Sequence, residues 1–278
     1  MVIRLSKIAA VLAISSCLLG CGNSMTEIKD EASASPSAAA TAYAPAAPTM
    51  TAVPSETAIP VPEEKNITIC LDPGHQSPDI TNNDMEPIAP GSSEMKLKVV
   101  SGTSGRYTGV PEYQLNLTIA LAVRDKLCAD GYNVVMTRED NETYVSNIDR
   151  ANIATDNGAN FCVRIHANGA ENPDANGALA LISTPSNPWV GSFYTQSLAL
   201  AQDVLNAYCA STGMVNTGIS EVDNMTGINW STMPVMILEM GFMTNETDDR
   251  NMENPTYQQN MINGIVQGIE TYAEGIGQ

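Results

Sequence analysis

Three runs of consecutive apolar residues each lead into a side chain that can do chemistry. The runs cover residues 67–71, 160–165 and 235–238. His75 follows the first run, His166 the second and Glu239 the third. Short continuous apolar runs predict strands buried on both faces of a sheet, and we expect residues 235–242 to form the central one. Ligands of open α/β sheets bind just outside the carboxyl ends of the strands, so these three side chains are predicted to meet at one site.

Helical patterns separate the predicted strands. One helix has Pro111 in its first turn and ends at Gly131; its apolar face is formed by Leu115, Ile119, Ala122, Val123 and Leu127. Further helices are predicted over residues 146–156, 192–208 and 256–272, and further strands over residues 133–136 and 178–182, the last as a candidate edge strand. This alternation predicts an α/β fold, a single domain with a mainly parallel twisted sheet flanked by helices on both faces.

The first residues have the pattern of an export signal. Arg4 and Lys7 precede an apolar run over residues 8–19, which is too short for a confident membrane span. The run closes with Leu18-Leu19-Gly20-Cys21, which resembles the cleavage box of bacterial lipoproteins, in which the cysteine is lipidated. We interpret residues 1–21 as a lipoprotein signal peptide ending at a lipidated Cys21, with an ordinary signal peptide as the alternative. This predicts an exported protein that a lipid holds on the membrane.

Residues 22–65 are rich in Ala, Ser, Pro and Thr and contain almost no large apolar side chain. Such a segment buries too little surface to offset the entropy lost on ordering, so we predict a flexible or partly extended linker. The remaining residues, 66–278, have the length of one α/β domain. We expect the chemistry of the protein to lie there.

The formal net charge of −18 argues against nucleic acid as a partner, because a phosphate-binding surface needs clustered Lys and Arg. Of the six cysteines, Cys17 and Cys21 precede the predicted domain. The others are not spaced as CxxC pairs, so we do not interpret them as zinc ligands. Export permits disulfide bonds, but we favour small buried thiols for Cys70, Cys128, Cys162 and Cys209.

Two histidines and a glutamate form one of the known ligand sets of catalytic zinc. The chain contains only two histidines, and both follow predicted strands. Glu112, beside Pro111 at a helix start, is the candidate third ligand, although acidic residues also favour the first helical turn for electrostatic reasons alone. A lone histidine is more often a packing residue than a ligand. Glu239 is harder to explain without a role, because a carboxylate that directly follows an apolar strand is costly to bury.

Four sequence motifs carry a resemblance to a known family. They are Leu71-Asp72-Pro73-Gly74-His75, Glu112-Tyr113-Gln114-Leu115-Asn116-Leu117, Arg164-Ile165-His166-Ala167-Asn168 and Leu238-Glu239-Met240-Gly241-Phe242-Met243-Thr244-Asn245. In this order they resemble the motifs of the zinc-dependent N-acetylmuramoyl-L-alanine amidases of the cell-division and sporulation type. The resemblance extends over nearly all of residues 66–278.

The resemblance implies that His75, Glu112 and His166 are the zinc ligands and that Glu239 is the catalytic carboxylate. The implied substrate is peptidoglycan, and the implied reaction is hydrolysis of the amide that joins N-acetylmuramic acid to the L-alanine of the stem peptide. The expected location is outside the membrane, facing the cell wall. A structural role is expected for Arg150.

The chain also departs from the family pattern. Arg164 stands where the family usually has a small residue, Met240 where it often has a threonine or an aliphatic residue, and residues 76–110 form a longer loop than compact members need. Asp72 and Asn168 lie beside the expected ligands, where they either orient them or only form turns.

The sequence leaves two other functions open. One is a zinc peptidase that acts on cell-wall peptides, which the order of the motifs disfavours. The other is a non-catalytic wall-binding lipoprotein, which would be expected to have lost a ligand or Glu239. The sequence leaves the oligomeric state open.

Overall fold

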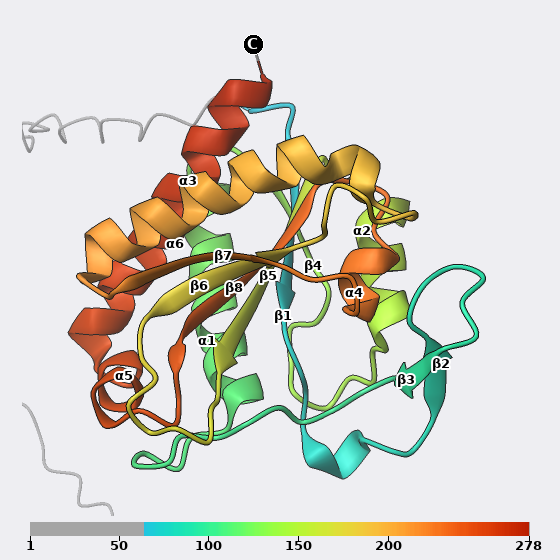
Figure 1. Ribbon diagram of the computed structural model, residues 1–278. Helices are drawn as coiled ribbons and strands as arrows, with labels where there is room; N and C mark the ends of the chain where they lie inside the picture. The colour runs from blue at the N-terminus through green and yellow to red at the C-terminus, as the bar shows by residue number, and fades with distance from the viewer. Residues whose placement is uncertain (1–63, 278) are drawn as a thin grey trace, which may run out of the picture. The chain divides into compact units, whose positions relative to one another are not determined.

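The computed structural model describes residues 64–277. Its main element is a six-stranded sheet with the strand order β4-β1-β5-β8-β6-β7. The strands are β1 (Thr68–Pro73), β4 (Asn133–Met136), β5 (Phe161–Asn168), β6 (Ala178–Ile182), β7 (Asn216–Glu221) and β8 (Val235–Phe242), and a separate two-stranded sheet is formed by β2 (Met85–Pro87) and β3 (Met95–Leu97). Figure 1 shows the small sheet standing apart from the large one.

The predicted helices are all present. They are α1 (Glu112–Ala129), α2 (Asn147–Asp156), α3 (Tyr194–Thr212) and α6 (Pro255–Ile276), joined by the short α4 (Thr226–Asn229) and α5 (Glu246–Met252) and the 3₁₀ turns η1 (Pro78–Ile80) and η2 (Gly191–Phe193). Helix α2 begins with a capping box between Ser146 and Asp149, and α6 begins with Asn254 as its cap and Pro255 in its first turn. Residues that accept the free N–H groups therefore fix where both helices begin.

Helices cover both faces of the sheet, as predicted. On β8, Met236, Leu238 and Met240 belong to the larger core, which is shared with α1, α3 and α6. Val235 and Ile237 alternate with them and belong to the smaller core against α2 and α4. Because successive strand residues point to opposite faces, one apolar run supplies both cores. Figure 1 shows α3 and α6 packed side by side on the larger core.

The sheet is mainly parallel, and β8 lies inside it as expected, but the edge strand was wrongly predicted. Strand β6 pairs antiparallel with β8 and parallel with β7, so β6 is an inner strand and β7 forms the edge. The sequence of β7, Asn216-Thr217-Gly218-Ile219-Ser220-Glu221, is polar and partly exposed. An edge strand pairs on one side only and buries little surface, and for this reason β7 carries no apolar pattern.

All four cysteines of the domain are free thiols, as favoured from the sequence. Cys70 and Cys162 are buried opposite each other on β1 and β5, but Cys128 is exposed and Cys209 only partly buried, so the expectation of burial was wrong for these two. Cys128 is exposed near the end of α1, and Cys209 on α3 packs against the margin of the larger core.

The predicted signal peptide, Cys21 and nearly all of the linker lie outside the described residues. Within residues 64–277, none of the helices combines the length and the apolar character that a membrane crossing requires.

Candidate active site

The three predicted strand ends converge. β1, β5 and β8 are neighbours in the sheet, and His166 on β5 lies directly opposite Glu239 on β8 in the strand register. His75 follows β1 at the same edge. Parallel strands bring their carboxyl ends to one side, so apolar runs that are far apart in sequence deliver their last residues to one place. The predicted convergence of these strand ends is therefore present in the sheet.

Glu112 joins the two histidines. Its Oε1 atom lies 3.2 Å from Nε2 of His75 and 3.2 Å from Nδ1 of His166. The backbone N–H of Ala167 donates to the same oxygen at 3.2 Å, and that of Thr103 donates to Oε2 at 2.9 Å. One ligand atom from each of His75, Glu112 and His166 can be chosen so that all lie within 4.8 Å of one another. These residues form the only such cluster of potential metal ligands within residues 64–277.

The protonation states at the site suit a divalent metal. Burial lowers the pKa of His166 to about 4, so its imidazole is neutral at pH 7. Burial opposes ionisation of Glu112, but hydrogen bonds with His166 and His75 outweigh it and hold the pKa of this carboxyl below its usual range. Metal ions bind deprotonated carboxylates and neutral imidazoles. The donor set, two imidazole nitrogens and one carboxylate oxygen, is one that zinc uses in catalytic sites, and the residues present therefore fit the ion.

Two glycines make room for this cluster. A Cβ atom on Gly74 would come within 2.2 Å of Nε2 of His166, and one on Gly102 within 2.4 Å of Oε2 of Glu112. Both distances are far below a normal contact, and Gly102 also has a φ of +77°, which other residues rarely adopt. Any side chain at these positions would displace His166 or Glu112 of the cluster.

Glu239 is a separate carboxylate beside the cluster. It lines the same cavity but is not a member of the three-residue cluster, and it makes no side-chain hydrogen bond to another residue within 64–277. Burial, together with the nearby charge of Glu112, raises the pKa of Glu239 to about 8. A carboxyl group with a pKa near neutrality can both accept and release a proton at working pH, which a general acid–base residue must do.

An open cavity of about 570 Å³ contains these groups. Its walls are His75, Gly102, Thr103, Arg106, Glu112, His166, Ala167, Asn168, Gly169, Ala170, Glu171, Glu239 and Thr244. The long loop over residues 76–110 thus supplies part of the cavity wall through Gly102, Thr103 and Arg106. The sequence marked this loop as unusual but did not indicate that it reaches the site.

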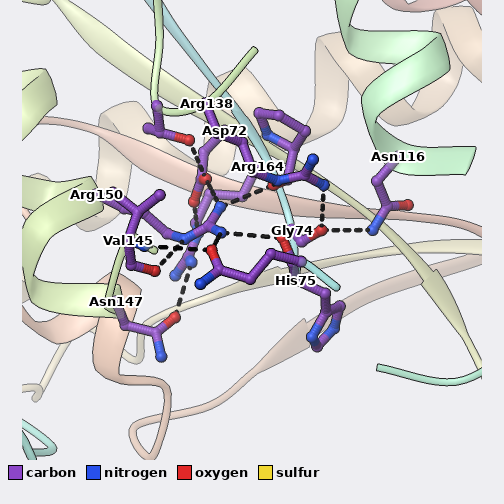
Figure 2. A network of polar contacts seen from close by, with 12 residues as sticks. Asp72, Gly74, His75, Asn116, Arg138, Val145, Asn147, Arg150 and Arg164 are labelled. Carbon is purple, nitrogen blue, oxygen red and sulfur yellow. Dashed lines mark hydrogen bonds and ion pairs between the residues drawn. The ribbon is translucent and has the colours of Figure 1, made fainter. Parts of the chain in front are cut away.

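An arginine network lies under the site (Figure 2). Asp72 is 1% exposed and binds Arg150 at 2.5 Å and Arg164 at 2.6 Å, while the Thr137 hydroxyl donates to it at 2.5 Å. Burial by itself would raise the pKa of Asp72, but the two guanidinium groups and the hydroxyl outweigh it and hold the pKa well below its usual range. Arg164, the departure from the family pattern, therefore serves to balance a buried carboxylate.

The same network fixes the turn that carries His75. Arg150 donates to the carbonyl oxygens of Pro73 at 2.7 Å and His75 at 3.0 Å, and Arg138 donates to those of Pro73 and Gly74, each at 2.9 Å. His75 has a φ of +62°, a strained value for a non-glycine residue, so the turn needs this support. The structural role expected for Arg150 is confirmed. The sequence analysis missed Arg138, which no motif distinguishes.

Of the two residues beside the expected ligands, Asp72 binds buried arginines, and Asn168 ends β5 and lines the cavity. The Asn168 side chain accepts a hydrogen bond from the N–H of Gly169 at 2.8 Å, and its own carbonyl accepts one from the N–H of Met243 at 2.8 Å. Neither side chain hydrogen-bonds to His75, Glu112 or His166 in the described part of the chain.

We expect Asp72→Asn to destabilise the fold strongly. The change leaves two buried guanidinium groups without their carboxylate, and removing one partner of a buried ion pair typically costs about 3–5 kcal/mol. The measurement is the free energy of unfolding from urea denaturation at neutral pH. The pKa of Asp72 is lower in the folded protein than in the unfolded chain, where it is about 3.9. The stabilisation is therefore complete above the pKa of the unfolded chain and is lost as the pH falls through the pKa of the folded protein.

Asp125→Asn is the matched control. Asp125 also pairs with an arginine, Arg124, at 2.7 Å, but its side chain is 68% exposed. An exposed ion pair typically contributes less than about 1 kcal/mol. Equal losses of stability in the two variants would contradict the role assigned to Asp72.

The sequence of this chain is similar to those of known proteins. A family model described as N-acetylmuramoyl-L-alanine amidase matches residues 69–271. An uncharacterised Bacillus subtilis protein, YqiI, is 31% identical over 174 residues, which are 62% of this chain and 78% of YqiI. The N-acetylmuramoyl-L-alanine amidase LytC of Bacillus subtilis is 28% identical over 205 residues, 74% of this chain but only 35% of LytC.

Solved structures of amidases also resemble this chain in fold. The amidase Ami1 of Mycobacterium smegmatis has a TM-score of 0.68 at 27% identity, with 76% of this chain and 98% of that one covered. An N-acetylmuramoyl-L-alanine amidase of Clostridium difficile 630 has a TM-score of 0.60 at 29% identity, and the match covers 75% of this chain and 97% of that one.

Proposed function

This chain belongs to the N-acetylmuramoyl-L-alanine amidase family and is an enzyme of that class, and we propose that it cleaves peptidoglycan with the help of zinc. The bond cleaved is the amide between N-acetylmuramic acid and the L-alanine of the stem peptide. The observation that carries the proposal is the convergence of His75, Glu112 and His166 in one cavity, with Glu239 beside them but outside their cluster.

His75, Glu112 and His166 would hold the zinc ion. When bound, zinc supplies a water molecule of lowered pKa and a positive charge that polarises the scissile carbonyl. Glu239 accepts the proton of the attacking water and passes it to the nitrogen of the departing L-alanine. This nitrogen leaves as a neutral amine, so cleavage requires such a proton transfer. The raised pKa of Glu239, about 8, suits both halves of the task.

The two other functions are less well supported. A wall-binding protein without activity has no need for Glu239 in a cavity beside the complete set of expected ligands. A zinc peptidase would use similar ligands, but the family match and the solved relatives favour the amidase.

Product analysis tests the proposal directly. The zinc-loaded protein is incubated with purified peptidoglycan, and the soluble products are identified by mass spectrometry and end-group labelling. We expect free stem peptides with an N-terminal L-alanine and glycan strands with free lactyl carboxylates. New amino groups that lie only inside the stem peptides would instead identify a peptidase.

The location of the enzyme is a further part of the proposal. Residues 1–21 would direct export, a lipid on Cys21 would hold the protein on the membrane, and residues 22–65 would let the domain reach the wall. We expect Cys21→Ala to move the protein from the membrane fraction to the soluble fraction or to block its processing. Cys17→Ala, a change within the predicted signal, is the control and should leave the distribution unchanged. An unmodified mature N-terminus at another residue, seen by mass spectrometry, would refute the lipid anchor.

A further inference from the structure

The active-site cavity contains one guanidinium group whose purpose the reaction does not explain. Arg106 is the only Arg or Lys among the residues that line it. The acidic side chains there are those of Glu112, Glu171 and Glu239. In a chain with a net charge of −18, a positive side chain in the wall of a cavity with three acidic residues is unusual.

Arg106 has no partner of its own. None of the ion pairs found within residues 64–277 includes it, and its side chain makes no hydrogen bond to a described residue. Arg138, Arg150 and Arg164, by contrast, are all buried and fully engaged. The guanidinium of Arg106 is thus available to a ligand, and Glu171 does not lie within ion-pair distance of it.

The loop that carries Arg106 is held firmly on both sides. Gly105 donates to the carbonyl of Val110 at 2.8 Å, and the backbone N–H of Arg106 donates to the carbonyl of Met243, beyond the end of β8, at 2.9 Å. On the outer side, Asp249 on α5 is 1% exposed and accepts three hydrogen bonds from the loop. These come from the N–H of Tyr107 at 2.7 Å and from the N–H and hydroxyl of Thr108 at 3.0 and 2.6 Å.

The inner end of the loop is tied to the metal-binding side chain. Thr103 donates from its N–H to Glu112 and accepts the N–H of Glu112 through its carbonyl at 3.0 Å. The backbone at Arg106 is therefore fixed relative to the expected metal, while its exposed side chain stays free to turn toward a ligand. A loop whose backbone is already held by the fold loses little backbone entropy when a ligand arrives, so only the side-chain freedom of Arg106 is lost on binding.

We propose that Arg106 is a specificity-determining residue that binds a carboxylate of the stem peptide near the scissile amide. The proposal rests on the proposed amidase function. A guanidinium group presents paired N–H donors that match a carboxylate, and it discriminates against an amide, which carries no charge and has only one acceptor oxygen. The nearest such group in a stem peptide is the α-carboxylate of a D-glutamate that follows L-alanine. In amidated peptidoglycan this group is a carboxamide.

The test uses two soluble muropeptides that differ only at the second residue of the stem, D-glutamate in one and D-isoglutamine in the other. With the zinc-loaded full chain we expect kcat/KM to be about 10-fold higher for the acid form, in keeping with a hydrogen-bonded charge that is partly exposed. Arg106→Gln should remove this preference by raising KM for the acid form, with kcat nearly unchanged. Arg106→Lys should retain part of it.

Arg250→Gln is the matched control. Arg250 lies 5.7 Å from the ring centre of Tyr107 but does not line the cavity, so the change removes the same charge from the same region. It should leave the preference intact. An equal kcat/KM for the two muropeptides in the wild type, or a preference that survives in Arg106→Gln, would overturn this proposal alone. Failure of the wild type to cleave either muropeptide or whole peptidoglycan would overturn the proposed function, and this proposal with it.

Discussion

Glu239→Gln is expected to lose activity by about 10² to 10⁴-fold while it keeps its metal. The amide has the shape of the carboxylate but cannot accept the proton of the attacking water. Glu239 is not a member of the cluster formed by His75, Glu112 and His166, so the expected ligands stay in place. The measurement is the turnover of purified peptidoglycan beside the zinc content of the same preparation.

The matched control is Glu171→Gln. Glu171 lines the same cavity, so the change removes a carboxylate from the same surroundings without touching the proposed proton carrier. Its turnover should stay within a few-fold of the wild type. Loss of zinc in Glu239→Gln, or normal turnover, would contradict the assignment of Glu239 as the proton carrier.

The variants His75→Ala and His166→Ala are expected to lose both metal and activity. Each variant removes one of the two imidazoles of the cluster, so that only one imidazole and the carboxylate of Glu112 remain. A metal acting as a Lewis acid contributes several kcal/mol to the transition state, and each 1.4 kcal/mol is a factor of about ten. We therefore expect turnover to fall by roughly 10³-fold or more.

A binding measurement separates metal loss from a damaged fold. Zinc that binds the folded state stabilises it by about 2.7 kcal/mol at a concentration of 100 times Kd, so the melting temperature of the wild type should rise when zinc is added. The rise should disappear in His75→Ala and His166→Ala. Thr103→Val, which replaces only a hydroxyl by a methyl group in the same cavity wall, should keep both the rise and most of the activity. A histidine variant that keeps its zinc response would remove that residue from the ligand set.

The sequence predicted the fold class and the place of the site from local patterns. The apolar runs before His75, His166 and Glu239 identify buried strands because only a strand covered on both faces is apolar throughout. Parallel strands end at a common edge, so the convergence of these side chains followed without any knowledge of the strand order. The family resemblance then implied that Glu112 is a ligand, which the helix pattern alone left open.

Features whose signal is not local required the tertiary structure. The edge strand β7 carries no apolar pattern, because half of its pairing groups face no other strand of the sheet. The network under the site joins Asp72 to Arg150 and Arg164, which are 78 and 92 residues further along the chain. No spacing rule relates charges so far apart. Only the strand register brings Asp72 and Arg164 together.

The position of Arg106 is also decided by the tertiary structure and not by the local sequence. The sequence indicated a long polar loop over residues 76–110, and within it Arg106 looks like any surface charge. Its place in the cavity wall depends on Asp249, 141 residues beyond Thr108, and on the carbonyl of Met243 after β8. Local patterns determine which segments are buried and where strands end, since these depend on neighbouring residues. Which distant side chains meet at those ends is decided by hydrogen bonds that form only when the sheet and its helices have assembled.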